Sequence, residues 1–190
     1  GDSRNIDFPY SKVNHLKVTS RQQYVWNKFV ASLDLGCQNN HREEWSLFHT
    51  HYGTTQLPPE KDPNKELMFT LDTYSSSLKI KTIGLDNWEY SFGADVQYQK
   101  NRIGGYSFLL PRYNRFTTGL FGLATWRIAE NLTASGGLRY DHGRVKIYEF
   151  LDSHLEDFLL DRGEDPEIVD EYKCRRRSLI RDLGDLSGSI

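Results

Sequence analysis

The amino-acid sequence predicts a mainly β protein: an antiparallel up-and-down meander followed by a C-terminal helical extension. Three observations support this fold class. Apolar and polar residues alternate with a period of two in several segments between residues 12 and 147. Short and long connections alternate between these segments. After about residue 148 the composition changes to charged, helix-favouring residues.

The alternation is clearest in three segments, Lys28–Gln38, Trp88–Gln99 and Leu132–Asp141. Successive side chains of a strand point to opposite faces, so each segment separates an apolar face from a polar one. The residues assigned to the apolar face are Phe29, Ala31, Leu33, Leu35 and Cys37 in the first segment, Trp88, Tyr90, Phe92, Ala94, Val96 and Tyr98 in the second, and Leu132, Ala134, Gly136, Leu138 and Tyr140 in the third.

Three less regular strands are expected at Leu16–Tyr24, Leu67–Ile80 and Phe116–Arg127. In Leu67–Ile80 the apolar residues change from odd to even positions, which predicts a β-bulge near Tyr74. Each of the six strands is close to the length of about 9–11 residues that crosses a bilayer when tilted.

The connections predict where such a meander would lie. Tight turns at 25–27, 84–87 and 129–131 alternate with long links at 41–65 and 101–113. Short turns at one end and long loops at the other are typical of outer-membrane barrels, which place the tight turns on the periplasmic side. The sequence therefore predicts part of a transmembrane β-barrel wall.

Aromatic residues gather near the expected short-turn end. They are Tyr24, Trp26, Trp88, Tyr90 and Trp126. Amphipathic rings at one height favour an interfacial girdle at headgroup depth. The alternative is a set of ordinary strand-forming aromatic residues in a soluble core.

The last forty residues predict a helical hairpin inside a loop. Leu151, Leu155, Phe158 and Leu159 share one helical stripe. Asp165-Pro166-Glu167 resembles an N-cap followed by a proline at the first helical position, so a second helix is expected to run to about Arg181. We divide the chain into a barrel segment at 8–147, a charged helical extension at 148–186 and the start of a further strand at 187–190.

Composition limits the remaining classes. The 190 residues carry a formal charge of −2 with a mean hydropathy of −0.65, and no apolar run approaches 18 residues. These values support one domain and exclude a transmembrane helix, but not a membrane-spanning strand. Near-neutral charge argues against a nucleic-acid partner. Cys37 and Cys174 form neither a disulfide framework nor a metal-ligand spacing.

Few residues suggest a site. His49 and His51, beside Tyr52 in a long loop, are candidate ligands for a metal or haem, since histidines at alternate strand positions share a face. No third ligand lies nearby in the sequence, so a polar loop with scattered histidines is the favoured interpretation. We therefore predict no bound metal and no cofactor.

The polar face carries charged residues that need interpretation. Arg139, Asp141, Asp34 and Asp95 could form an ion pathway or a catalytic group, but a solvated lumen lining with cross-strand pairs is favoured. No catalytic constellation is present in the sequence, so we predict that the chain is not an enzyme.

Four segments resemble TonB-dependent outer-membrane receptors, in particular those of Bacteroidetes. The resemblance covers about residues 8–147 and resumes at 187–190. Cys37 departs from it, because the family has an aromatic residue there. The segments are Phe8-Pro9-Tyr10-Ser11-Lys12-Val13-Asn14-His15, Gly36-Cys37-Gln38-Asn39-Asn40-His41-Arg42-Glu43-Glu44, Leu109-Leu110-Pro111-Arg112-Tyr113 and Gly136-Gly137-Leu138-Arg139-Tyr140-Asp141.

The resemblance implies a slice of the barrel wall of a receptor in the outer membrane of a Gram-negative bacterium. Such receptors import scarce nutrients, such as iron chelates, haem, cobalamin or glycans, with energy from the TonB complex. The implied partners are outer-membrane lipid, an extracellular nutrient bound by loops 41–65 and 101–113, and the TonB complex acting through a plug domain that no segment here resembles. The resemblance identifies no ligand-binding residue.

Two other interpretations remain open at this point. A soluble lipocalin-like β-barrel carrier would turn Phe29, Leu33, Tyr90, Phe92 and Leu138 inward around a small ligand. A structural or adhesive surface domain would need a closed sheet that does not depend on lipid. For an isolated barrel slice we predict self-association through its open edges, or tail helices folded over the apolar face.

Overall fold

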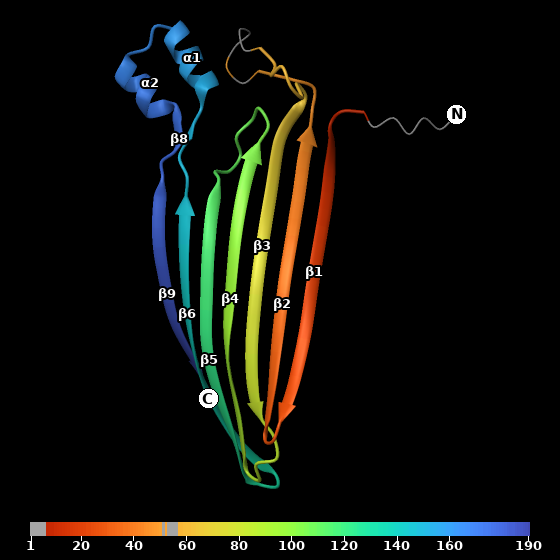
Figure 1. The fold of residues 1–190 in the computed structure, drawn as a ribbon. Helices are drawn as coiled ribbons and strands as arrows, with labels where there is room; N and C mark the ends of the chain where they lie inside the picture. The colour runs from red at the N-terminus through yellow and green to blue at the C-terminus, as the bar shows by residue number, and fades with distance from the viewer. Residues whose placement is uncertain (1–6, 51, 53–56) are drawn as a thin grey trace, which may run out of the picture.

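A computed structural model describes residues 7–50, 52 and 57–190 of the chain. Seven long strands form one antiparallel sheet, and six of them follow one another as neighbours in chain order (Figure 1). This meander confirms the predicted fold class. The strands, in spatial order, are β1 (Tyr10–Trp26), β2 (Phe29–Trp45), β3 (Lys65–Thr82), β4 (Trp88–Gly104), β5 (Tyr113–Ala129), β6 (Leu132–Ile147) and β9 (Leu179–Ser189).

The strands meet in tight turns at one end and in long loops at the other (Figure 1). Asn27 and Gly84 adopt positive φ values of 49° and 66° in two of the turns. Asparagine and glycine tolerate this left-handed backbone, which explains their presence where the chain reverses within a few residues. We name the two ends of the sheet the turn end and the loop end.

The longest loop joins β6 to β9 and contains two short helices. It consists of β7 (Phe150–Leu151), α1 (Ser153–Asp161), α2 (Pro166–Tyr172) and β8 (Cys174–Arg176), with β7 and β8 paired to each other. The Asp152 carboxylate caps α1 by accepting from the Leu155 N–H at 3.1 Å, and Asp165 caps α2 by accepting from the Glu167 N–H at 2.8 Å. The predicted helical hairpin and its second N-cap are present.

Two details of this tail differ from the prediction. Helix α2 ends at Tyr172, well before Arg181, and the last strand begins at Leu179 and not near Ser187. Residues 179–189 pair along β6, which gives the backbone groups of that strand partners that a longer helix would have left unpaired. The helices lie beyond the loop ends of β6 and β9 and do not cover the sheet (Figure 1).

The predicted β-bulge near Tyr74 is wrong. The pairing of β3 with β2 and with β4 continues through Tyr74 without a shift, and the irregularity of the β2–β3 pair lies at Glu44 and Trp45. Strands β1–β6 are also longer than predicted, with 16–18 residues each. The false bulge and the underestimated strand lengths have one cause. Each strand passes from one environment into another along its length, as described below.

The sheet has almost no buried core of its own. Among the described residues, the buried hydrophobic side chains are those of Leu67, Leu155 and Val169, and many large apolar residues are exposed. No helix in the described part of the chain is long and apolar enough to span a membrane. The stability of this sheet must therefore come largely from what covers its exposed apolar face.

Candidate functional site

The alternating apolar residues of β2, β4 and β6 that were assigned from the sequence share one face of the sheet, which we name the outer face. It carries the even positions of β1, β3, β4, β5 and β6 and the odd positions of β2, because cross-strand partners point to the same side. Phe92 and Leu138 on this face are 45% and 67% exposed. The faces assigned from the sequence to Lys28–Gln38, Trp88–Gln99 and Leu132–Asp141 agree with this arrangement.

Aromatic rings gather on the outer face at the turn end. Trp88 stacks on Trp126 with ring centroids 5.3 Å apart and on Tyr90 at 5.7 Å, while Trp26 stacks on Phe29 at 6.3 Å. The gathering of these rings at one end agrees with the predicted girdle, since amphipathic rings collect where hydrocarbon meets water.

A second group of rings lies in register across the middle of the sheet. Tyr74 pairs with Tyr98, and Tyr98 pairs with Phe116, so three rings form one row on the outer face. Cys37 pairs with Tyr74 and continues this aromatic row onto β2. Cys37, where the family has an aromatic residue, therefore places a thiol in this row.

The distance between the two aromatic groups fits a bilayer. Trp88 and Tyr98 are ten residues apart on β4, which corresponds to about 34 Å along a strand. With the tilt of about 35–45° that is usual in membrane barrels, the height is about 26 Å, close to the apolar band of about 25 Å. We name the part of β1–β6 between the turn end and the aromatic row the wall.

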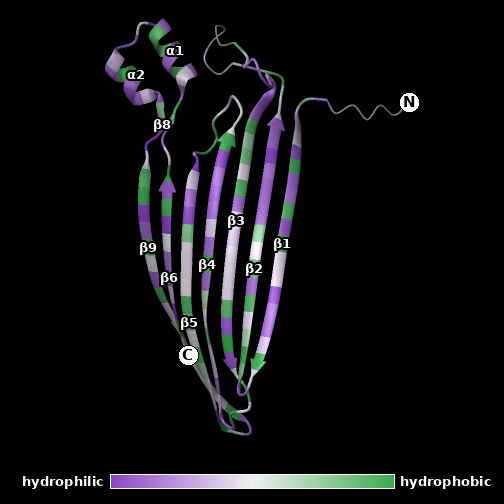
Figure 2. Cartoon of the chain, viewed as in Figure 1, coloured by the Kyte–Doolittle hydropathy of each residue, from purple (hydrophilic) through white to green (hydrophobic). Residues whose placement is uncertain are grey.

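The strands continue beyond the aromatic row toward the loop end, and we name this part the extension. Its outer face carries a polar network on β2, β3 and β4: Asn39 donates to Asp72 at 2.6 Å, and Arg102 donates to the same carboxylate at 2.7 Å. Leu16 on β1 and Met68 on β3 are apolar residues of the same face. Hydrophilic residues predominate in the upper parts of β2 and β4 (Figure 2). On β3, Leu67, Phe69 and Leu71 point to the opposite, inner face.

This reversal explains the misleading pattern in β3. The apolar set moves from even to odd positions because hydrocarbon contacts the outer face of the wall but ends at the aromatic row. The backbone keeps its register throughout, so the change of phase reflects the surroundings and not an inserted residue.

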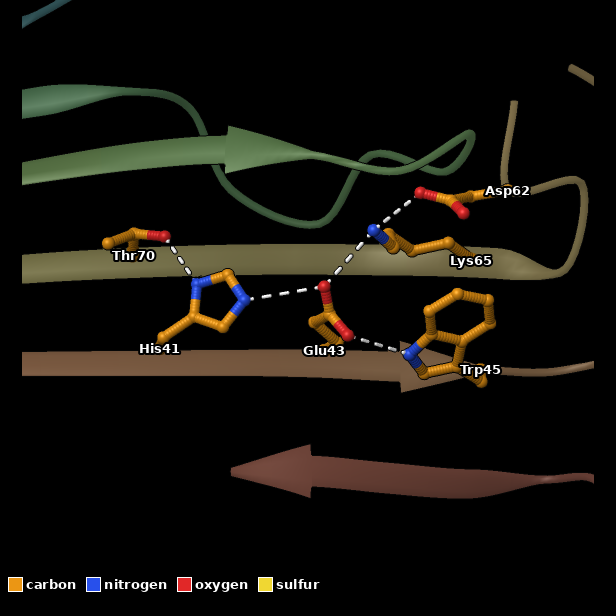
Figure 3. Close-up of polar contacts among 6 residues, drawn as sticks. All are labelled: His41, Glu43, Trp45, Asp62, Lys65 and Thr70. Atoms are coloured by element: carbon orange, nitrogen blue, oxygen red, sulfur yellow. Dashed lines mark hydrogen bonds and ion pairs between the residues drawn. The ribbon is translucent and has the colours of Figure 1, made fainter. Parts of the chain in front are cut away.

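A polar cluster in the extension fastens the loop between β2 and β3 to the sheet (Figure 3). Lys65 bridges Asp62 of the loop at 2.8 Å and Glu43 of β2 at 3.1 Å. Glu43 also accepts from the Trp45 indole N–H at 3.0 Å and lies 3.3 Å from the His41 ring, whose other nitrogen lies 2.8 Å from the Thr70 hydroxyl.

This cluster sets the charge state of its members. Burial would raise the pKa of Glu43, but hydrogen bonds from Lys65, Trp45 and His41 outweigh burial, and the pKa lies below its ordinary value. The hydrogen bond to Asp62 and the contact with Glu43 raise the pKa of Lys65. Both groups are therefore charged over the whole neutral range, which keeps the loop anchored.

The inner face of the wall is concave and polar. Side chains from all six strands β1–β6 line one hollow of about 720 Å³, which requires the sheet to curve around it. Its lining includes Lys17, Thr19, Ser75, Ser77, Gln97 and Thr117. Such a surface suits water, or polar groups of another segment, as expected of a barrel lumen.

Ion pairs cross the strands on this inner face. Arg139 donates to both oxygens of Asp141 at 2.7 Å and reaches Asp95 at 3.2 Å, while Arg21 pairs with Asp34 at 2.6 Å. Arg139 crosses β5 above Gly119, where a Cβ atom would lie within 2.6 Å of these side chains. Cross-strand pairs are present between Arg139 and Asp95 and between Arg21 and Asp34, whereas Arg139 and Asp141 both lie on β6.

The loops form a second concave site, which we name the loop pocket. It has a volume of about 470 Å³ and lies among the loop before β3, the loop after β4 and the helical segment. Phe108 and Phe150 stack in its wall with centroids 4.2 Å apart. Its lining also includes Tyr52, Pro59, Tyr106, Asp152, His154 and Arg175.

Three residues far apart in the sequence join one wall of the loop pocket. Tyr52 donates to the Asp152 carboxylate at 2.8 Å, and Arg175 donates to Asp152 at 3.2 Å and to the Tyr52 hydroxyl. Burial and the Asp152 carboxylate raise the pKa of Tyr52, so the phenol stays neutral. Asp152 also caps α1, so the same carboxylate links the network to this helix.

The three loop candidates proposed from the sequence have different positions. Tyr52 lines the loop pocket, whereas His49 contacts Tyr106 at 3.3 Å and lies 3.9 Å from Glu66. His51 lies outside the described residues. In the part of the chain that the structure describes, no group of three His, Cys, Asp or Glu residues is placed to hold a metal ion.

Sequence reasoning missed Phe108, Phe150 and Arg175. Arg175 begins the run Arg175-Arg176-Arg177, but its partner Tyr52 lies 123 residues away. No local signal joins these positions, because loop contacts depend on how the strands order the loops in space.

One comparison with known proteins identifies a family. The model of the TonB-dependent receptor-like β-barrel family matches residues 2–162. This chain belongs to that family. No curated protein and no solved structure matches the chain.

Membership decides between the open interpretations. TonB-dependent receptors are transporters and not enzymes, as predicted. In the lipocalin-like alternative the rings of Tyr90 and Phe92 would face a cavity, but they lie on the face opposite the hollow and are exposed. The family and this outward orientation both contradict a soluble carrier.

Proposed function

We propose that the chain forms part of the barrel of an active-transport receptor in the outer membrane of a Gram-negative bacterium. The receptor takes up a scarce nutrient, such as an iron chelate, haem, cobalamin or a glycan, with energy from the TonB complex acting through a plug domain. The four sequence segments named above support the Bacteroidetes type. Family membership supports the coarser part of this proposal, outer-membrane active transport.

The single observation that carries the proposal is the two-faced wall. An apolar outer face bounded by aromatic rings suits lipid, and a concave polar inner face suits a lumen. Neither face would be stable in the surroundings of the other. The apolar outer face would be exposed to water, and the ion pairs of the inner face would be buried in hydrocarbon.

The loop pocket supports a role in ligand capture. It lies at the loop end, which faces the cell exterior when the tight turns are periplasmic. Stacked rings next to fixed polar groups provide both apolar contact and hydrogen bonds. We propose that this pocket contributes to the first contact with the nutrient.

Uptake measurements test the proposal. Cells with and without the gene would be supplied in turn with a ferric chelate, haem, cobalamin or an oligosaccharide as the limiting nutrient. We expect the gene to increase uptake of one of them, and a protonophore to abolish that increase. Gene-dependent uptake that persists with the protonophore, or no gene dependence with all four, would contradict the proposal.

A matched pair of variants tests the loop pocket. Phe108→Ser removes one of the stacked rings, whereas Leu109→Ser changes an exposed neighbour that does not line the pocket. We expect Phe108→Ser to raise the half-saturating nutrient concentration about tenfold, and Leu109→Ser to change it less than about twofold. Equal effects of the two variants would exclude the pocket from ligand capture.

A further inference from the structure

A group of cations lies on the outer face immediately beyond the aromatic row. Lys100 pairs with Asn114, and Asn114 pairs with Lys146, so these side chains form the next row of the outer face on β4, β5 and β6. Arg102 and Arg112 lie one position farther toward the loop end, and Arg144 pairs with Phe116 at the β6 end of the aromatic row. We name the five basic residues Lys100, Arg102, Arg112, Arg144 and Lys146 the cationic patch.

The patch carries more positive charge than its neighbours balance. Asp72 accepts from Arg102 at 2.7 Å, and Asp182 lies 3.8 Å from Arg144. Within the described residues, no carboxylate lies within 4.0 Å of the other three cations, Lys100, Arg112 and Lys146. This contrasts with Lys65 on the neighbouring strand, which two carboxylates hold.

Tyr148 provides a hydroxyl group beside two cations of the patch. Arg112 and Lys146 lie 5.5 and 4.9 Å from the centroid of its ring. The Asn114 side-chain amide donates to the Tyr148 hydroxyl oxygen at 3.0 Å, so the hydroxyl proton remains available for another acceptor. Two cations and a hydroxyl donor around one ring form a site for an anion with several oxygen atoms.

The height of the patch indicates which anion it meets. Lys100 lies two residues beyond Tyr98 along β4, and Lys146 pairs with Asn114, which lies two residues from Phe116 along β5. Two residues of a strand at the usual tilt place both lysines about 5 Å farther from the bilayer centre than the aromatic row. The headgroup layer on each side of the hydrocarbon is about 5–7 Å thick. The patch therefore continues directly from the apolar belt into the layer where lipid phosphates lie.

We propose that the cationic patch binds the phosphate groups of lipid in the outer leaflet. The long side chains of lysine and arginine reach from the edge of the apolar belt toward the headgroups. The patch thereby fixes one side of the barrel, along β4–β6, to anionic lipid. This inference rests on the proposed placement of the wall in the outer membrane and extends it to a lipid class.

Lipid titration of the intact receptor tests the inference. The receptor in detergent would be titrated with phosphatidylglycerol and with a neutral diacylglycerol glycolipid, and bound lipids counted by native mass spectrometry. We expect phosphatidylglycerol to bind more tightly. Each cation removed should weaken its binding about fivefold, equivalent to about 1 kcal/mol, so Lys100→Gln combined with Lys146→Gln should weaken it about 25-fold. Tyr148→Phe should weaken it about threefold.

The control removes the same charge from the opposite face. Lys17→Gln combined with Lys79→Gln changes two lysines of the inner face, and we expect phosphatidylglycerol affinity to change less than about twofold. Resistance of each variant to carbonate extraction from membranes measures insertion separately, and loss of insertion in the unmodified receptor would contradict the proposed function itself.

Four results would overturn the lipid assignment. The glycolipid could bind as tightly as phosphatidylglycerol, or the two double variants could have equal affinities. Alternatively, millimolar inorganic phosphate could displace phosphatidylglycerol and bind at the patch without lipid, which would make the patch a site for soluble anions. Retained affinity in an inserted Lys100→Gln, Lys146→Gln variant would exclude the patch from lipid binding.

Discussion

The wall and the extension are parts of the same strands, yet on β4 their outer faces have opposite polarity. On β4, Val96 and Tyr98 occupy the outer face of the wall, whereas Lys100 and Arg102 occupy the outer face of the extension. On the inner face of β4 the wall carries the polar residues Asp95 and Gln97, whereas the extension ends with the apolar residue Ile103. The pairing of β3 with β4 is continuous across this boundary.

The comparison shows that backbone geometry and side-chain pattern are set by different causes. Hydrogen bonds between strands fix the register, and both regions satisfy them equally. The surroundings decide which face is apolar, so the pattern reverses where hydrocarbon ends. A change of phase in a barrel strand can therefore mark the edge of the membrane.

The largest effect is expected from a charge placed in the wall. Ala94→Arg puts a guanidinium on the outer face near the middle of the apolar belt, and we expect a loss of about 2–4 kcal/mol in the free energy of unfolding. Gln97→Arg puts the same group on the polar inner face, with an expected change of about 0.5 kcal/mol. Urea titration of the receptor in lipid vesicles measures both, and equal losses would refute the assignment of faces.

A smaller effect is expected from filling space on the inner face. A Cβ atom at Gly93 would overlap the Leu78 carbonyl oxygen and lie 2.7 Å from carbons of the Phe121 ring, which covers this glycine from the paired strand. We expect Gly93→Ala to cost about 1–3 kcal/mol, because backbone must move.

The matched control for this substitution lies on the outer face of β5. A Cβ atom at Gly122 meets nothing within 4 Å, so Gly122→Ala should be neutral or stabilise by up to about 1 kcal/mol. The same urea titration compares the two variants. A cost at Gly122 equal to that at Gly93 would mean that the outer face is packed and not open to lipid.

The smallest effect concerns the extension. Glu43→Gln removes the carboxylate that holds Lys65, His41 and Trp45, and we expect a local loss of about 1 kcal/mol at the loop anchor. Faster amide hydrogen exchange at Ser46 and Lys65, whose N–H groups bond to Asn64 and Asp62, would report this loss. Unchanged exchange at both amides would show that the cluster does not anchor the loop.

The anchor should also depend on pH. The folded pKa of Glu43 is depressed, so its stabilisation is present above the ordinary glutamate pKa of about 4.3 and is lost as pH falls through the folded value. The folded pKa of Lys65 is raised, so its contribution is present below the ordinary lysine pKa of about 10.4 and is lost as pH rises through the folded value. Exchange at Ser46 and Lys65, corrected for intrinsic rates, should be slowest between these limits.

The sequence predicted the wall well, because its pattern has a simple physical source. One-sided alternation in Trp88–Gln99 directly reports lipid on one face and water on the other, and the structure places those residues accordingly. The first helix was also predictable from its apolar stripe, and the second N-cap from local capping chemistry.

The sequence predicted the extension and the loop pocket less well. In β3 the apolar residues change from even to odd positions while the alternation continues. A β-bulge produces a similar pattern, and the sequence of one strand does not distinguish the two causes. The start of β9 depends on pairing with β6, and the contact of Tyr52 with Arg175 depends on the folding of two loops. Such long-range contacts leave no period in the sequence.

Solvent accessibility along β4 tests the boundary between wall and extension most directly. Nitroxide labels would replace, one at a time, Phe92, Val96, Lys100 and Arg102 in the receptor reconstituted in lipid vesicles. Oxygen should collide preferentially with labels at the first two positions, and a water-soluble nickel chelate with labels at the last two. The same collision ratio at all four positions, or a change elsewhere than between Val96 and Lys100, would contradict a membrane edge at the aromatic row.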